Sequence, residues 1–318
     1  MMGLKDVIAL QLSPLSSYLE AELARRCTVT AWHALDDGQR RDWLADHADK
    51  VRLIVTGGQT GCPSDLIAAL PALALIAIHG VGYDKVDVPF AQSRGVDVST
   101  TPDVLTDDVA DLAVGLTIGL LRGLPMADRF VRDGRWGAES FPLARRVSGR
   151  RFGIVGLGRI GRAIADRLHV FGDVAYHGRT AKDAPYRFEP DLKVLAQTSD
   201  ILVLACAAND ATRHLIDVEI LAALGPDGYL VNVARGSVVD ETALVAALES
   251  GAIAGAALDV FADEPAVPAA LVASGRTHLT PHIASATVET RIAMADLVLA
   301  NVDALIAGQR PPTALALP

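Results

Sequence analysis

The chain has 318 residues, of which 51% are hydrophobic, and a formal net charge of −9. This length is sufficient for two domains with separate cores, and the acidic balance without a long basic tract argues against nucleic-acid binding. The three cysteines form no C-x-x-C pair and no metal-like cluster. Such sparse cysteines predict reduced thiols, no metal site and a cytoplasmic protein.

Strand-like and helix-like segments alternate along the first hundred residues. The apolar runs at 7–10, 51–55, 74–78 and 96–99 are typical of strands, with amphipathic segments between them. This alternation predicts a parallel sheet covered by helices. The N-terminal segment lacks the features of a signal peptide. The apolar stretch 66–78 is too short to span a bilayer and contains Pro71, so we expect no membrane association.

A second α/β series follows a long apolar helix predicted at 104–121. Its expected strands lie at 152–155, 174–177, 201–205, 229–233, 254–258 and 277–279. The last helix, predicted at 287–307, has one apolar face formed by Met294, Val298, Val302 and Ile306. Because it follows the last strand of the second series, we expect it to return to the first domain. The first domain (1–99 and 285–318) would then be discontinuous, with the second (100–284) inserted into it.

A glycine motif follows the first strand of the second series. Residues 155–161 read V-G-L-G-R-I-G, with glycines at 156, 158 and 161. In a strand–turn–helix context this G-x-G-x-x-G predicts a dinucleotide site. Gly156 permits the turn, Gly158 lets the pyrophosphate approach the backbone, and Gly161 lets the helix pack closely. The intervening Leu157, Arg159 and Ile160 belong to the same predicted site. The alternative is a glycine turn without a ligand.

The expected fold is therefore α/β, with two Rossmann-like or flavodoxin-like domains containing parallel sheets. The cofactor domain is inserted into a discontinuous substrate domain, and a cleft between the two would hold the substrate.

The end of the next strand indicates which dinucleotide binds. NAD is favoured by a carboxylate about 20 residues past the glycines, whereas an arginine suits the 2′-phosphate of NADP. The chain has His177, Gly178, Arg179 and Thr180 at this point, without an acid. The guanidinium of Arg179 can bind phosphate with two donors. We therefore expect NADP(H), with NAD(H) as the weaker alternative, unless Arg179 simply points to solvent.

Three further residues have the chemistry needed to reduce a 2-keto acid. Arg235 follows a predicted strand and could anchor a carboxylate and polarise a carbonyl. His282 could supply a proton near neutral pH, and Glu264 could orient its imidazole. The alternatives are that Glu264 is an acid at a helix N-terminus and that His282 is a buried core histidine.

The chain resembles the D-isomer-specific 2-hydroxyacid dehydrogenases, and among them the NADPH-preferring glyoxylate/hydroxypyruvate reductases. The matching motifs are HGVGYDKVD (79–87), TPDVLTDDVADLAVGL (101–116), GRWGAESFPL (134–143), the glycine fingerprint, ATRHLI (211–216), VNVARGSVVDE (231–241), LDVFADEP (258–265) and PHIASAT (281–287). This resemblance implies reduction of glyoxylate and hydroxypyruvate to D-2-hydroxy acids, with Arg235, Glu264 and His282 as the catalytic set.

The resemblance also implies further contacts. The amides of Val81 and Gly82 would hold the substrate carboxylate, and Ser285 would contact its hydroxymethyl end. The additional cofactor-binding positions would be Thr106, Val233 and Asp259, with Asp259 on the nicotinamide carboxamide. Trp136 is similar to an aromatic residue that reaches the partner's active site in homodimers built from region 104–141. Its alternative is an ordinary core or interface anchor.

Two positions depart from the family's usual pattern. Ala284 stands where glycine is common, and residues 207–209 lack the proline often found there. The first leaves the exact substrate open. Another 2-hydroxy acid, a phosphonate or a 3-phosphoglycerate-type substrate would be an alternative. A non-catalytic, dinucleotide-sensing scaffold is an alternative of a different class.

Overall fold

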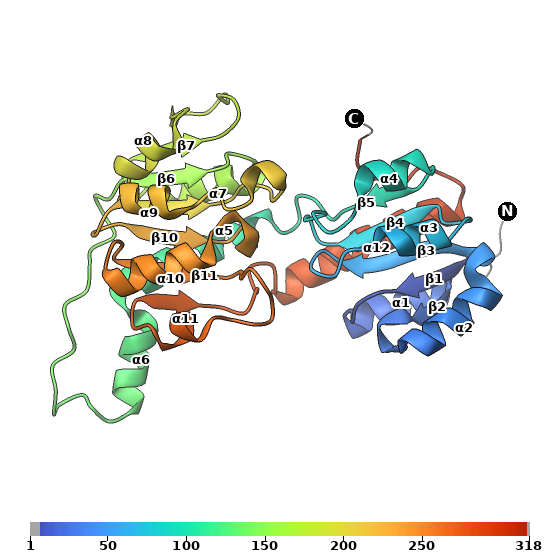
Figure 1. The fold of residues 1–318 in the computed structure, drawn as a ribbon, viewed down its shortest axis with the longest axis horizontal. Helices are drawn as coiled ribbons and strands as arrows, with labels where there is room; N and C mark the ends of the chain where they lie inside the picture. Colours follow the sequence, from blue (N-terminus) through green and yellow to red (C-terminus); the bar gives the residue numbers. More distant parts are fainter. Residues whose placement is uncertain (1–6, 317–318) are drawn as a thin grey trace. The chain divides into compact units, whose positions relative to one another are not determined.

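The computed structural model describes residues 7–316 of the chain. It forms two compact units, one from Met1–Leu105 with Thr287–Pro318 and the other from Thr106–Ala286 (Figure 1). The chain therefore leaves the first unit and returns to it, whereas the sequence predicts these two changes at 99/100 and 284/285. The change from unit 1 to unit 2 comes later in the chain than predicted, because Thr101 N–H donates to Gly80 O at 2.8 Å and so keeps this residue in unit 1. The N-terminal segment, in which the sequence predicts no signal peptide, includes residues 1–6. These six residues lie outside the described part of the structure.

The described part of unit 1 contains a five-stranded parallel sheet with the order β2-β1-β3-β4-β5. Its strands are β1 (Ile8–Gln11), β2 (Thr28–Ala31), β3 (Val51–Gly57), β4 (Leu75–His79) and β5 (Asp97–Ser99). Its helices are α1 (Ser17–Arg26), α2 (Asp37–His47), α3 (Ser64–Ala69), α4 (Val88–Ser93) and α12 (Val288–Ile306). The four strands predicted from apolar runs are present. The edge strand β2 was missed because its residues are at most half-buried and form no apolar run.

Helix α12 belongs to unit 1, as its position after the last strand predicts. It begins at Thr287, whose side chain accepts a hydrogen bond from Thr290 N at 3.2 Å. The predicted apolar face is buried, with Met294 and Val298 each 1% exposed and Val302 fully buried. Val298, Val302 and the partly buried Ile306 pack with α1 and with the sheet, so burial of this face holds the C-terminal segment on unit 1.

The described part of unit 2 contains a seven-stranded parallel sheet with the order β12-β11-β10-β9-β6-β7-β8. Its strands are β6 (Phe152–Val155), β7 (Val174–His177), β8 (Arg187–Phe188), β9 (Ile201–Leu204), β10 (Tyr229–Asn232), β11 (Gly255–Leu258) and β12 (Thr277–Leu279). The six predicted strands are confirmed within a residue at each end, and the two-residue edge strand β8 was missed. Strand order reverses between β6 and β9, the place where such sheets bind ligands beyond their carboxyl ends.

Helices cover both faces of the unit 2 sheet. These helices are α5 (Thr106–Arg122), α6 (Leu124–Arg132), α7 (Arg159–Leu168), α8 (Leu192–Gln197), α9 (Val218–Leu224), α10 (Glu241–Ser250) and α11 (Ala269–Ala273). Helices α8, α9 and α10 pack beside one another, while α5 packs with α7 (Figure 1). Covered on both faces, strands β6, β9, β10 and β11 are buried along their whole length, as expected for a parallel sheet.

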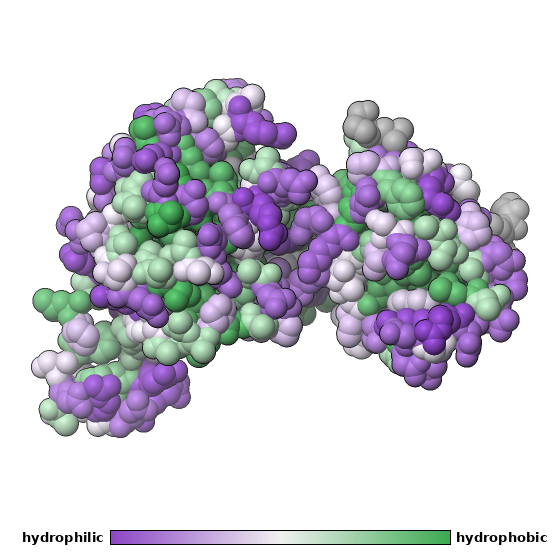
Figure 2. Space-filling model, viewed as in Figure 1, coloured by the Kyte–Doolittle hydropathy of each residue, from purple (hydrophilic) through white to green (hydrophobic). Residues whose placement is uncertain are grey.

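Helix α6 and the segment after it lie apart from the sheet of unit 2 (Figure 1). Figure 2 shows hydrophobic and hydrophilic residues side by side at this corner. The exposed apolar side chains of this segment are Leu124, Met126, Val131, Trp136 and Leu143. Within residues 7–316, no single helix has the length and apolar composition of a membrane span; α5 and α6 meet those criteria only as a pair, bent by 61°.

Candidate active site

The glycine motif forms the turn between β6 and α7. Gly156 has φ +95°, and a Cβ there would lie 2.7 Å from Cα of Cys206, which follows β9. A Cβ on Gly161 would lie 1.9 Å from the carbonyl oxygen of Gly156. The structure thus confirms that these two glycines permit the turn and the close packing of α7. A Cβ on Gly158 would meet no atom within 4 Å, so the turn leaves open space beside the helix N-terminus.

This turn fits a dinucleotide on physical grounds. It lies at the carboxyl end of β6, beside the reversal of strand order, and α7 begins at Arg159 with N–H groups suited to bind phosphate. Leu157, in the turn, and Ile160, in the first turn of α7, are half-buried. Of the other predicted cofactor positions, Thr106 opens α5 and Val233 follows β10. Their contacts with a cofactor stay predictions.

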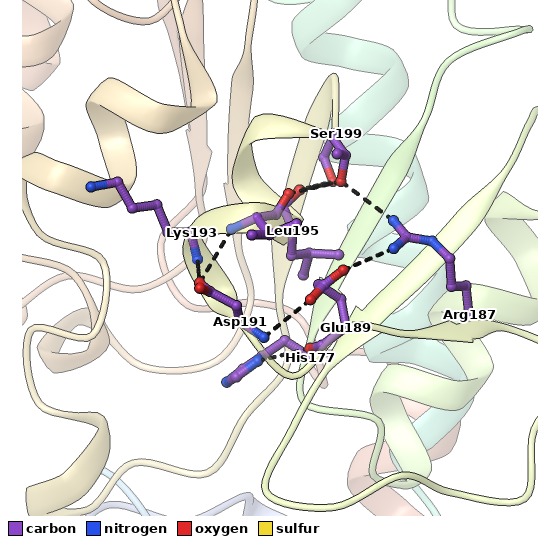
Figure 3. A network of polar contacts seen from close by, with 9 residues as sticks. His177, Arg187, Glu189, Asp191, Lys193, Leu195 and Ser199 are labelled. Carbon is purple, nitrogen blue, oxygen red and sulfur yellow. Dashed lines mark hydrogen bonds and ion pairs between the residues drawn. The ribbon is translucent and has the colours of Figure 1, made fainter.

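The end of β7 carries the residues expected to distinguish NADP from NAD. His177 Nδ1 lies 3.1 Å from the backbone oxygen of Glu189, which fixes the imidazole (Figure 3). The Glu189 carboxylate forms an ion pair with Arg187 at 2.9 Å and accepts from Asp191 N at 3.2 Å. This acid is therefore engaged in the network of Figure 3.

Arg179 and Thr180 follow this strand end directly and are exposed. In the part of the chain that the structure describes, no carboxylate forms an ion pair with Arg179. Arg179 therefore presents its guanidinium at the surface beyond the end of β7, and its contact with a ribose phosphate stays a prediction.

The loop after β10 presents Arg235. The side chain of Asn232, which is 1% exposed, accepts from Ala234 N at 3.0 Å and donates to Arg235 O at 3.0 Å. Arg235 itself is half-buried, and its Nη1 donates to Ala234 O at 2.8 Å. The buried amide thus fixes the backbone on which the guanidinium is carried. Sequence reasoning missed this role of Asn232, although a polar residue inside a buried strand was a usable signal.

The Arg235 loop approaches the segment that carries Glu264. A Cβ on Gly236 would lie 1.9 Å from the backbone carbon of Phe261, so only glycine permits this approach. Burial tends to raise the pKa of Glu264. Hydrogen bonds from His282 and from Phe261 N–H, with the charges of His282 and Arg235, outweigh burial and lower that pKa. Glu264 is therefore held as a carboxylate.

Glu264 and His282 form the pair that the sequence predicts. Glu264 Oε2 lies 2.8 Å from His282 Nδ1, and Glu264 Oε1 accepts from Phe261 N at 3.0 Å. Both side chains are about one-fifth exposed, at 23% and 22%. With Nδ1 donating to the carboxylate, Nε2 is the ring atom left to exchange a proton with a ligand. This contact favours a paired acid and base over the alternatives, in which Glu264 is an acid at a helix N-terminus and His282 is a buried core histidine.

Asp259 holds the turn that carries His282. This fully buried carboxylate accepts from Thr280 Oγ1 at 2.6 Å, Ile283 N at 2.8 Å and Ala284 N at 2.9 Å. His282 has φ +53°, a backbone conformation that non-glycine residues adopt only when their surroundings impose it. Asp259 therefore has a positioning role that sequence reasoning missed, and its predicted contact with the nicotinamide stays a prediction.

Ser285 and Ala284 follow on the same turn. Ala284 is 7% exposed and Ser285 is half-buried. The methyl group of Ala284 is thus packed inside the protein. The contact of Ser285 with a substrate stays a prediction.

In unit 1 the predicted carboxylate-binding turn follows β4. Val81 and Gly82 are half-buried. Two residues before Val81, burial and the charge of Arg291 lower the pKa of His79 to about 4, so this histidine is neutral near pH 7. Sequence reasoning assigned no role to His79, although it opens the motif 79–87, or to Arg291, because no local pattern shows that the two residues interact.

Trp136 lies in the segment after α6 and is 78% exposed. This exposure contradicts the alternative that it is a core anchor. Its neighbour Arg135 forms an ion pair with Glu139 at 2.6 Å. The indole is thus presented on the surface of unit 2.

Comparison with known proteins agrees with this geometry. Residues 114–284 match the family model described as the NAD-binding domain of D-isomer-specific 2-hydroxyacid dehydrogenases. The chain is 44% identical to glyoxylate/hydroxypyruvate reductase A of Arabidopsis thaliana, over 96% of this chain and 98% of that protein. It is also 44% identical to hydroxyphenylpyruvate reductase of Plectranthus scutellarioides, over 94% and 96%.

A solved structure shares the whole fold. It is the NADPH-dependent glyoxylate/hydroxypyruvate reductase of Sinorhizobium meliloti, in complex with NADP and malonate. The TM-score is 0.90 at 40% identity, and the alignment covers 98% of this chain and 97% of that one. With the glycine turn, the Arg235 loop and the Glu264–His282 pair, these matches show that the chain belongs to the D-isomer-specific 2-hydroxyacid dehydrogenase family.

Proposed function

We propose that the protein reduces small 2-keto acids, with glyoxylate and hydroxypyruvate as substrates and NADPH as the hydride donor, to D-2-hydroxy acids. The observation that carries this proposal is the Glu264–His282 hydrogen bond at 2.8 Å in a loop system that also presents Arg235. The relatives and the solved structure named above support this substrate class and cofactor.

Each catalytic group has one task in this proposal. Arg235 binds the substrate carboxylate and polarises the keto group, assisted by the amides of Val81 and Gly82. The bound nicotinamide supplies the hydride. His282 donates the Nε2 proton to the developing alkoxide, and Glu264 stabilises the imidazolium and fixes its orientation.

A substrate panel tests the proposal. NADPH and NADH oxidation would be followed with glyoxylate, hydroxypyruvate, pyruvate, phenylpyruvate and 3-phosphohydroxypyruvate. Turnover of the first two supports the assignment. Turnover of phenylpyruvate alone would keep the mechanism and move the substrate toward that of the hydroxyphenylpyruvate reductase. NADPH binding without any turnover would support the scaffold alternative.

Arg179→Ala tests the cofactor assignment. We expect kcat/KM for NADPH to fall by roughly 10- to 100-fold, because charge-assisted hydrogen bonds to the 2′-phosphate are lost. The value for NADH should stay nearly unchanged. Lys193→Ala, which removes an exposed cation of α8 in unit 2 (Figure 3), is the control. An unchanged ratio of kcat/KM for NADPH to kcat/KM for NADH in Arg179→Ala would show that Arg179 does not bind the 2′-phosphate.

We also propose that the protein is a cytoplasmic homodimer. Support for the dimer comes from the exposed apolar side chains of α6 and its following segment, because surface of this kind is typical of interfaces. Support for the compartment comes from the cysteines Cys27, Cys62 and Cys206, which are free thiols.

Trp136→Ala tests whether the indole lies at the interface and reaches the partner's site. We expect a KM for hydroxypyruvate raised several-fold and a weaker dimer in sedimentation velocity, since aromatic anchors dominate interface energies. Trp136→Phe, which retains an aromatic ring, should show smaller changes. If Trp136→Ala alters neither the KM nor the assembly, the cross-subunit contact is wrong.

A further inference from the structure

A buried tyrosine lies directly beneath the loop that carries Arg179. Tyr176, which pairs with Phe188 of β8, is 1% exposed, and its ring lies 5.3 Å from the ring of Phe188. Its hydroxyl accepts from Lys182 N at 2.6 Å and donates to Lys182 O at 3.3 Å. A buried phenol needs such partners. Here both partners belong to one residue of an otherwise exposed loop.

These two hydrogen bonds close a ring of chain from residue 176 to residue 182. Arg179 and Thr180 lie inside this ring, and both are exposed. A second attachment follows, because Arg162 of α7 donates to Asp183 O at 3.4 Å. The loop is thus tied at its far end while the Arg179 side chain lies at the surface.

The near end of the ring is joined to the glycine turn. His177 O accepts from Gly156 N at 2.9 Å, and Tyr176 O accepts from Glu189 N at 2.8 Å. The segment expected to bind the 2′-phosphate and the segment expected to bind the pyrophosphate therefore share one hydrogen-bonded frame.

We propose that Tyr176 is a positioning residue for cofactor selection: its hydroxyl holds loop 178–182 in the conformation in which Arg179 and Thr180 receive the 2′-phosphate of NADPH. This inference rests on the proposed role of Arg179. A loop that must become ordered when the ligand binds weakens binding, and a loop already ordered avoids that loss. A ligand without the 2′-phosphate makes no use of this ordering.

The test is the near-isosteric Tyr176→Phe in the full chain, titrated calorimetrically with adenosine 2′,5′-bisphosphate and with 5′-ADP. The loss of hydrogen bonds to the loop should weaken binding of the bisphosphate by roughly 3- to 10-fold and leave the affinity for 5′-ADP unchanged. Amide exchange in 179–183 should become faster, and KM for NADPH should rise with kcat unchanged. Tyr229→Phe, a buried tyrosine of β10 in the same sheet, is the matched control and should alter none of these values.

A second pair of variants removes the same contact from the loop side. Lys182→Pro deletes the N–H that donates to Tyr176, whereas Lys182→Ala keeps it and removes only the charge. Only the proline variant should reproduce the weaker binding of the bisphosphate with unchanged binding of 5′-ADP. This pair decides the question even if Tyr176→Phe folds poorly.

The outcomes separate this inference from the cofactor assignment. Binding of the bisphosphate could be weakened by Arg179→Ala but not by Tyr176→Phe or Lys182→Pro. Tyr176 would then have no positioning role, and the assignment of Arg179 to the 2′-phosphate would stand. Equal weakening of both nucleotides by Tyr176→Phe would also overturn the inference, because it indicates general damage. If Arg179→Ala leaves bisphosphate binding unchanged, the assignment itself fails.

Discussion

Replacing His282 with alanine should lower kcat by about 10²- to 10⁴-fold, the range that a general acid contributes. The NADPH affinity should change little, because the glycine turn and the end of β7 are separate from the His282 turn. The Nε2 of His282 is the ring atom left free by its contact with Glu264, so the variant removes the proton donor while Arg235 is retained. Steady-state NADPH oxidation and direct NADPH titration would measure the two quantities.

Two further variants make this result specific. His33→Ala removes an exposed histidine of unit 1 and should leave kcat unchanged. Glu264→Gln keeps a hydrogen-bonding oxygen beside Nδ1 but removes the charge that stabilises the imidazolium. Its kcat should lie between those of the unchanged protein and His282→Ala. Near-normal turnover in His282→Ala would show that the proton comes from another group.

The strands and the glycine turn could be predicted because their signals are local. The bounds of β6 and β7 agree with the expected ranges because both strands are mostly apolar and buried, in a sheet covered on both faces. Strands β2 and β8 lie at the sheet edges, where partial exposure removes the apolar signal. Their existence depends on pairing with a neighbour that the local sequence does not reveal.

The identity of the site residues could be predicted, whereas their support could not. Arg235, Glu264 and His282 each follow a strand-like run in a motif, but the positive φ of His282 depends on three hydrogen bonds to Asp259. The approach of the Arg235 loop depends on backbone contact between Gly236 and Phe261. Such contacts join segments more than twenty residues apart, and no periodicity in the sequence encodes them.

Arg235→Ala should reduce kcat/KM for the keto acid by roughly 10²- to 10⁴-fold, because two charge-assisted hydrogen bonds to the carboxylate are lost. Arg235→Lys keeps the charge but not the planar fork, so an intermediate loss is expected. Oxamate, a carboxylate that resembles the substrate, should lose its competitive inhibition in Arg235→Ala. Arg213→Ala removes an exposed arginine of the same unit and is the control.

The kinetic pattern of this variant distinguishes anchoring from proton transfer. A group that binds the carboxylate in both the ground state and the transition state raises KM when removed, whereas a group that acts only in the transition state lowers kcat alone. Arg235→Ala should therefore raise KM and weaken the inhibition by oxamate. His282→Ala should lower kcat with KM nearly unchanged. If Arg235→Ala retains both its KM and its inhibition by oxamate, the carboxylate is bound by other groups, and the amides of Val81 and Gly82 become the principal candidates.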